Sequence, residues 1–132
     1  MDQLGLWDFL NEQGENAILK WGEDDRLSPR DRAALNQKLD RLIQMDFALA
    51  IGTKLLAGPI YKHIYKLRVK GDVALRPMLC RGPIDNEKEY TLLRGAVEIG
   101  GKLPDRAQKQ AEENRQTIIR TPSRRCPHER IT

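Results

Sequence analysis

The sequence has little that would carry the chain across a membrane or suit it to an oxidising compartment. No apolar run approaches the roughly 20 residues that a membrane-spanning helix needs. The first residues, MDQLGLWDFLNEQGEN, are acidic and lack the basic start and small-residue cleavage site of a signal peptide. Only two cysteines occur, Cys80 and Cys126, far apart in the chain. We therefore expect a cytoplasmic protein with free thiols rather than a disulfide.

Signatures of several chemistries are missing as well. The Gly100–Gly101 pair indicates a turn, because no strand-to-helix phosphate-loop pattern surrounds it. Cys126 and His128 could each bind a metal, but a zinc site needs about four ligands, and His63 and Cys80 are not spaced to complete it. No helix with a basic outer face suits the reading of DNA, so a DNA-binding module is the weakest alternative. We expect neither a metal nor another cofactor.

What the sequence does have is a short and mildly basic chain. Its 132 residues carry a formal net charge of +4 and suffice for one domain with a modest core. We expect a single domain at residues 1–120 and a basic C-terminal tail at residues 121–132 that offers little to the core. The positive balance permits a nucleic-acid partner without establishing one.

The first half of the chain favours helices. Residues 4–10 (LGLWDFL) fit either an edge strand or the start of a helix, and residues 17–25 indicate a short helix. The clearest helix is predicted at residues 27–45, where Ser28 can cap, Pro29 suits the first position and leucines recur at helical spacing. A less regular linker follows, ending at residues 57–59.

After this linker the hydrophobic period changes to two, which is typical of strands. Residues 63–77 (HIYKLRVKGDVALRP) predict a hairpin with Lys66 and Arg68 on one face. A three-residue loop that starts at Gly71, with positive φ there, would place Arg68 opposite Arg76. Two facing arginines repel each other unless an anion lies between them, so we expect both guanidinium groups to face one cleft.

The rest of the chain predicts two more strands and a helix. The second strand (residues 73–80) contains Pro77, which indicates a bulge or an edge. Residues 90–99 (YTLLRGAVEI) predict a central strand, and residues 104–119 predict the last helix. The expected fold class is therefore α+β, with two N-terminal helices and one C-terminal helix packed on one face of a small, mainly antiparallel sheet.

Four features of the second half resemble the RelE/HigB superfamily of bacterial and phage toxins. They are the KLR run at residues 66–68, Arg76 after the hairpin turn, the GGKLP loop at residues 100–104, and Ala111 in the last helix. The resemblance covers about residues 5–120 and implies a RelE-like fold.

The resemblance also implies an activity and partners. Members of this superfamily are toxins of type II toxin–antitoxin systems, and the implied activity is a ribosome-dependent mRNA endonuclease in which the RNA 2′-hydroxyl attacks the neighbouring phosphate. No metal or cofactor is expected. The implied partners are the ribosome, its mRNA and a cognate antitoxin, which in the HigB branch is usually a helix-turn-helix protein.

That reaction needs a proton acceptor, cations that stabilise the phosphorane and a proton donor for the leaving 5′-oxygen. By the resemblance, we expect catalytic roles for Lys66, Arg68, Arg76 and Glu98. We expect RNA-binding roles for Lys62, Arg81, Arg94 and Lys102.

Structural roles stay open for some of these residues. Arg68 can brace the sheet through Glu98, and Glu98 can form an ion pair with Arg94, which shares its strand face. His63 has a suitable intrinsic pKa, but it falls on the apolar side of its strand, which favours a packed histidine. Residues 95–107 lack the His or Tyr that many family members carry there. The alternative function is therefore a catalytically inactive RelE-fold protein that binds a partner protein or RNA.

Overall fold

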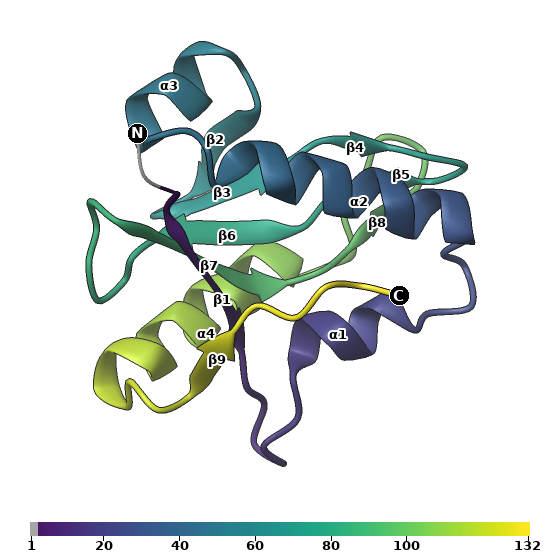
Figure 1. Cartoon of the computed structure of the whole chain (residues 1–132). Coiled ribbons are helices and arrows are strands. Elements are labelled where there is room, and N and C mark those ends of the chain that lie inside the picture. Colours follow the sequence, from purple (N-terminus) through teal and green to yellow (C-terminus); the bar gives the residue numbers. More distant parts are fainter. Residues whose placement is uncertain (1–2) are drawn as a thin grey trace.

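A six-stranded sheet runs through the centre of the protein (Figure 1). The structure is a computed structural model that describes residues 3–132. The strands lie in the order β2-β3-β6-β7-β1-β9, and all neighbours are antiparallel except β1 and β7. The mainly antiparallel α+β class is confirmed. The strands are β1 (Gly5–Phe9), β2 (Leu56–Tyr61), β3 (Ile64–Leu67), β6 (Met78–Arg81), β7 (Glu89–Arg94) and β9 (Arg125–Pro127).

A second, three-stranded sheet continues three strands of the first sheet, and each of the three is interrupted between the two sheets. Its order is β4-β5-β8, with β4 at Val69–Lys70, β5 at Ala74–Leu75 and β8 at Val97–Glu98. Pro77 lies between β5 and β6, where the sequence indicated an irregularity. The strand predicted at residues 90–99 is divided between β7 and β8, and Trp21 lies so close to Gly95 that a Cβ there would collide with its ring. The strand is therefore interrupted at Gly95 and Ala96, just before Glu98.

Four helices complete the described part of the chain: α1 (Ala17–Gly22), α2 (Pro29–Leu42), α3 (Phe47–Gly52) and α4 (Ala107–Arg120). Helix α2 begins as predicted, because Ser28 and Asp31 form a capping box and Pro29 opens the helix. Helix α3, capped by Asp46, and strand β2 both lie partly in the segment expected to be an irregular linker. None of the helices in residues 3–132 combines the length and apolar character required to cross a membrane.

Helices cover both faces of the sheet, so the expectation that all helices pack on one face is wrong. Leu92 of β7 belongs to a core cluster with the leucines of α2, whereas the next residue, Leu93, belongs to a second cluster with Ala111 and Ile118 of α4. Consecutive strand residues point to opposite faces. Figure 1 shows α2 and α4 on opposite sides of the sheet. The three layers leave α4 beside the face that carries Lys66.

The last residues form part of the domain rather than the expected tail. Strand β9 pairs with β1, so β1 is an inner strand and not an edge strand. Ile131 is buried, and the Asn36 side chain bonds both its N–H and its carbonyl oxygen. His128 Nδ1 lies 2.8 Å from Oδ1 of the fully buried Asp8. The basic residues of this segment therefore have partners that lie more than 30 positions away in sequence.

The hairpin has the predicted register but a different reason for its glycine. Lys66 pairs with Met78 and Lys70 pairs with Ala74, as a three-residue loop requires. Gly71 does not have positive φ, which corrects the expectation. A Cβ at Gly71 would instead collide with Oδ1 of Asp31. Glycine is required there because the first turn of α2 approaches the loop.

Candidate active site

A cavity of about 480 Å³ opens beside the N-terminus of α4, and it contains three of the expected site residues. Lys66 comes from β3, Glu98 from β8, and Lys102 from the loop before α4. The rest of the lining comes from the end of β2, the loop before α4 and the first turn of α4: Tyr61, Gly101, Leu103, Pro104, Asp105, Arg106, Ala107, Gln108 and Lys109. Such a volume falls in the usual range for ligand sites, about 300–1,000 Å³.

Local structure directs both lysines to this cavity. Lys66 lies two residues after Ile64, which packs in the α4 cluster, so both side chains leave β3 on the α4 side. Ile99 and Lys102 exchange backbone hydrogen bonds across Gly100 and Gly101, whose φ angles are 60° and 76°. A two-residue turn with positive φ at both central positions is a tight hairpin turn that suits glycine. The Gly100–Gly101 pair thus places Lys102 beside Glu98.

Glu98 is held by Arg76. Arg76 Nε donates to Glu98 Oε2 at 2.6 Å, and Arg76 Nη1 donates to the Leu75 carbonyl at 2.8 Å. The side chains are 11% and 17% exposed, respectively, so water weakens this pair little. Within residues 3–132, Oε1 of Glu98 accepts no hydrogen bond. One carboxylate oxygen is thus held by Arg76, the other has no partner among the described residues, and Glu98 lines the cavity.

The expected two-arginine clamp does not form. Arg68 is exposed and is not part of the cavity lining, whereas Arg76 is 9% exposed and paired with Glu98. The proposed bracing of Glu98 by Arg68 is also wrong, since Arg76 takes that place. Extrapolation of the hairpin register would pair Arg68 with Arg76. Neither residue belongs to a strand, however, so the pairing of the two strands is interrupted there. The two guanidinium groups therefore do not share one site.

The other expected RNA-binding residues lie apart from the cavity. The Arg81 guanidinium stacks over the Phe47 ring at 4.2 Å. Arg94 lines a different cavity, and burial lowers the pKa of its guanidinium. The expected Arg94–Glu98 ion pair is absent from the described residues, because the break at Gly95 removes the shared strand face. Lys62 lines an adjacent groove along α4.

Tyr61, Arg106 and Lys109 are cavity residues that the sequence reasoning missed. Tyr61 lies at the end of β2, a strand that was not predicted, and α4 packs against that strand. His63 follows in the hairpin turn and is exposed, which corrects the expectation of a packed histidine. The basic residues at the start of the predicted last helix were the available signal for Arg106 and Lys109.

Two observations restrict other chemistries at this site. Both cysteines are free, as expected, and burial raises the pKa of the Cys80 thiol to about 12 and also raises that of Cys126. Neither thiol is therefore an activated nucleophile. In residues 3–132, no group of three or more His, Cys, Asp or Glu side chains is placed to hold a metal ion.

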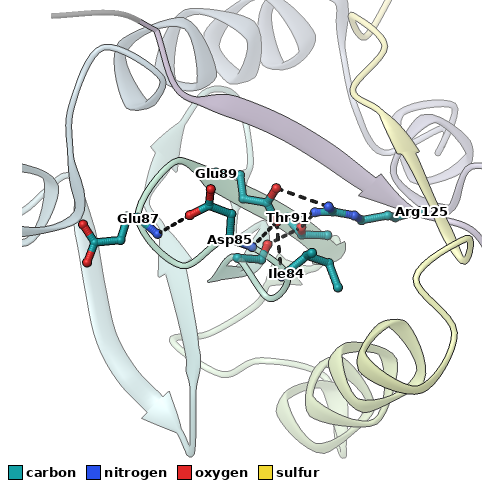
Figure 2. A network of polar contacts seen from close by, with 7 residues as sticks. Ile84, Asp85, Glu87, Glu89, Thr91 and Arg125 are labelled. Carbon is teal, nitrogen blue, oxygen red and sulfur yellow. Dashed lines mark hydrogen bonds and ion pairs between the residues drawn. The ribbon is translucent and has the colours of Figure 1, made fainter.

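A second arginine–glutamate pair is largely buried, and Figure 2 shows its polar contacts. Arg125 binds both carboxylate oxygens of Glu89, at 2.6 and 3.2 Å, and also Thr91 Oγ1. The backbone N–H groups of Ile84 and Asp85 donate to Glu89 Oε2, and the Arg125 guanidinium lies 4.0 Å from the centre of the Trp7 ring. Glu89 has no oxygen left for a ligand.

Comparisons of the chain with protein-family models, with curated proteins and with solved structures found no match. The functional argument therefore depends on the geometry of the cavity and on the residues that line it.

Proposed function

We propose that the protein is a RelE/HigB-type toxin that binds RNA in this cavity and cleaves it by metal-independent attack of a 2′-hydroxyl on the adjacent phosphate. The observation that carries the proposal is the placement of Lys66, Glu98 and Lys102 around one open cavity, from three separate parts of the chain. The resemblance implies catalytic roles for Lys66 and Glu98 and an RNA-binding role for Lys102. Two cations and a carboxylate are suitable groups for phosphodiester transfer.

Each group has a definite task in that reaction. Glu98 Oε1 accepts the proton of the 2′-hydroxyl while the 2′-oxygen forms its bond to phosphorus. Lys66 and Lys102 stabilise the extra negative charge of the phosphorane, because fixed cations interact more strongly with the transition state than with the substrate. The bond from phosphorus to the 5′-oxygen then breaks, and a lysine ammonium group supplies the proton that this oxygen takes up. The products are a 2′,3′-cyclic phosphate and a 5′-hydroxyl.

Arg76 acts in this scheme as a positioning residue. It holds Oε2 of Glu98 in place from the buried side and does not itself reach into the cavity lining. A carboxylate that is fixed at one oxygen loses little freedom when the other oxygen accepts a proton. This role differs from the direct phosphate contact expected for Arg76.

One observation favours the alternative, a RelE-fold protein that binds RNA or a partner without cleaving. The Arg76–Glu98 pair is short and largely buried, as an ion pair that only braces the sheet would be. In this case the lysines would retain a polyanion at the cavity, and Glu98 would serve only the sheet. Binding without cleavage is the result that this alternative requires.

An antitoxin, if the chain has one, would act by covering the cavity mouth. The charged lining residues are four cations and two carboxylates, so we propose that the covering segment is acidic; they are Lys66, Lys102, Arg106, Lys109, Glu98 and Asp105. Such a segment should compete with RNA for the wild-type protein and less well for Lys66→Gln.

Induced expression in a bacterial host tests the proposal. We expect the wild-type chain to arrest growth, and mapping of mRNA 5′ ends should show new cuts on translated messages. Lys66→Gln and Glu98→Gln should remove both effects. Glu87→Gln and Lys88→Gln are matched controls, because both residues are exposed in the loop before β7, and they should leave the arrest intact.

The chemistry is tested on purified protein with ribosomes and a translated message. One fragment of each cut should end in a 2′,3′-cyclic phosphate and the other should begin with a 5′-hydroxyl. Fragments with a 3′-hydroxyl and 5′-phosphate would exclude the proposed reaction. Growth arrest that survives Glu98→Gln would exclude Glu98 as the proton acceptor.

A further inference from the structure

A second compartment lies beside the cavity, along α4. A groove, also of about 480 Å³, is lined by the end of β2 and by one side of α4. Tyr61 and Lys109 belong to the lining of both compartments. The other lining residues of the second compartment are Lys62, Glu112, Glu113, Gln116, Thr117 and Arg120. The two compartments are therefore adjacent, and Tyr61 and Lys109 lie at their junction.

Tyr61 is placed to present its ring at this junction. It is half-buried at the last position of β2, and Ile64, its partner across the hairpin, packs towards α4. The Nζ atom of Lys62 lies 5.5 Å from the ring centre, within the range of a cation–π contact. Within residues 3–132 the Tyr61 hydroxyl has no hydrogen-bond partner, so no polar contact of that group explains its position. Because Tyr61 lines both compartments, a ligand that spans them would contact it.

The charge of the second compartment suits a polyanion as well. Lys62, Lys109 and Arg120 line it. Of its two acidic residues, Glu112 is 5% exposed and paired with Arg115 at 3.1 Å, so Glu113 is the remaining unpaired acid in the lining. A basic groove interrupted by an aromatic ring is the arrangement with which proteins hold single-stranded nucleic acid.

We infer that the groove binds single-stranded RNA across both compartments and that Tyr61 stacks on a nucleobase at their junction. The ligand is thus a strand of several nucleotides rather than an isolated phosphate or mononucleotide. The first compartment holds the reacting phosphate, and the second holds the continuing strand along α4. This inference takes its choice of ligand from the proposed function, but it concerns binding and does not require cleavage.

Binding of short 2′-O-methyl oligouridylates tests the inference, because these RNAs lack the nucleophile and cannot be cleaved by the proposed reaction. Affinity of the wild-type chain should rise with length from one nucleotide up to about six and then level off. Tyr61→Ala should weaken binding of the longer RNAs about tenfold, the size expected for one stacked base, and change binding of the mononucleotide little. Tyr61→Phe should bind like the wild type, because the ring and not the hydroxyl makes the contact.

Charge variants locate the strand along α4. A plot of log affinity against log salt concentration has a negative slope. For long RNAs only, Arg120→Gln should make this slope less steep by about 0.7, the value for one phosphate contact on a single strand. Lys88→Gln is the control, because Lys88 is exposed and lines neither compartment. Circular dichroism of each variant confirms that it is folded before binding is measured.

The inference is overturned if affinity does not depend on RNA length, if Tyr61→Ala binds long RNAs like the wild type, or if Tyr61→Phe is as weak as Tyr61→Ala. It is also overturned if poly-L-glutamate competes as well as the RNA, since the groove would then be a general polyanion site. Length-dependent binding without cleavage of unmodified RNA would refute the proposed function and leave this inference standing. Cleavage without length dependence would do the reverse.

Discussion

Two arginine–glutamate pairs lie on the sheets of this protein, and they differ in what they leave free. In both pairs the shortest N–O distance is 2.6 Å and both side chains are largely buried. Glu89 binds Arg125 through both of its oxygens and also accepts from the loop before β7. Glu98 binds Arg76 through one oxygen and lines a cavity. A fully satisfied carboxylate stabilises the fold, whereas a half-satisfied one beside a cavity can also bind or react.

Burial alone therefore does not separate a structural ion pair from a functional one. A more specific criterion for a functional ion pair is an oxygen or nitrogen atom that has no partner in the protein, in a residue that lines a cavity. Arg125 also contacts the Trp7 ring and Thr91, and both oxygens of Glu89 have partners. The following experiments change one pair at a time and compare stability with RNA binding.

The largest effect on stability is expected from Glu89→Gln. This change leaves the Arg125 guanidinium buried without its counter-ion, and breaking a buried pair in this way costs about 3–5 kcal/mol. Denaturant unfolding of the purified variant measures the loss. A loss below about 1 kcal/mol would show that the pair is much more hydrated than its 8% and 10% exposure indicates.

A smaller loss, about 1–3 kcal/mol, is expected from Asp31→Asn. Asp31 is another fully satisfied carboxylate, with Oδ1 accepting from Asp72 and Val73 and Oδ2 accepting from Ser28. Burial by itself would raise the pKa of Asp31, but the N–H groups of Ser28, Val73 and Asp72 and the Ser28 hydroxyl outweigh burial and lower it.

The lowered pKa gives this prediction a pH dependence. The stability that Asp31 contributes is present above its unfolded pKa of about 3.9 and is lost as pH falls through the lower folded value. The wild type should therefore lose stability more steeply below about pH 4 than Asp31→Asn does. Unfolding curves at a series of pH values check this, and parallel curves for the two proteins would contradict the assignment.

Glu98→Gln should cost less stability than Glu89→Gln, about 1 kcal/mol, because the remaining amide oxygen can keep the single hydrogen bond from Arg76. At Glu89 both oxygens accept from N–H groups, so an amide NH₂ there must face a donor. The same denaturant series gives the answer. Equal losses for the two variants would remove the structural basis for treating the pairs differently.

The smallest effect is expected from Lys66→Gln on RNA binding at different salt concentrations. Loss of one phosphate contact should lower the log–log salt slope by about 0.7 and leave the free energy of unfolding nearly unchanged. Lys88→Gln should change neither quantity. An unchanged slope for Lys66→Gln would show that the lysine does not contact the RNA backbone.

The sequence predicted well the elements whose signals are local. Helix α2 was placed by its capping box and leucine spacing, and the hairpin register followed from the position of the arginines relative to the turn. Helix α3 has only six residues, and Gly58–Pro59 interrupts the apolar pattern of β2, so neither element has a strong local signal. Tyr61 was missed for that reason.

The parts that failed depend on contacts between distant residues. The alanine stripe of α4 indicated a buried face but not which side of the sheet it covers. Arg125 and His128 read as charges of a solvated tail, because their partners Glu89 and Asp8 are 36 and 120 positions away. Glu98 pairs with Arg76 rather than with Arg94, because the strand is interrupted at Gly95. The alternation of side chains along a strand does not predict such an interruption.

The most direct test of the central claim is the rate of RNA cleavage by three proteins under one condition in which all are folded: the wild type, Glu98→Gln and Glu89→Gln. We predict that Glu98→Gln slows cleavage by about 10²–10⁴-fold, as loss of a general base does, while it still binds RNA. Glu89→Gln, although less stable, should cleave at the wild-type rate. Equal rates for the wild type and Glu98→Gln, or no cleavage by the wild type with ribosomes present, would contradict the account.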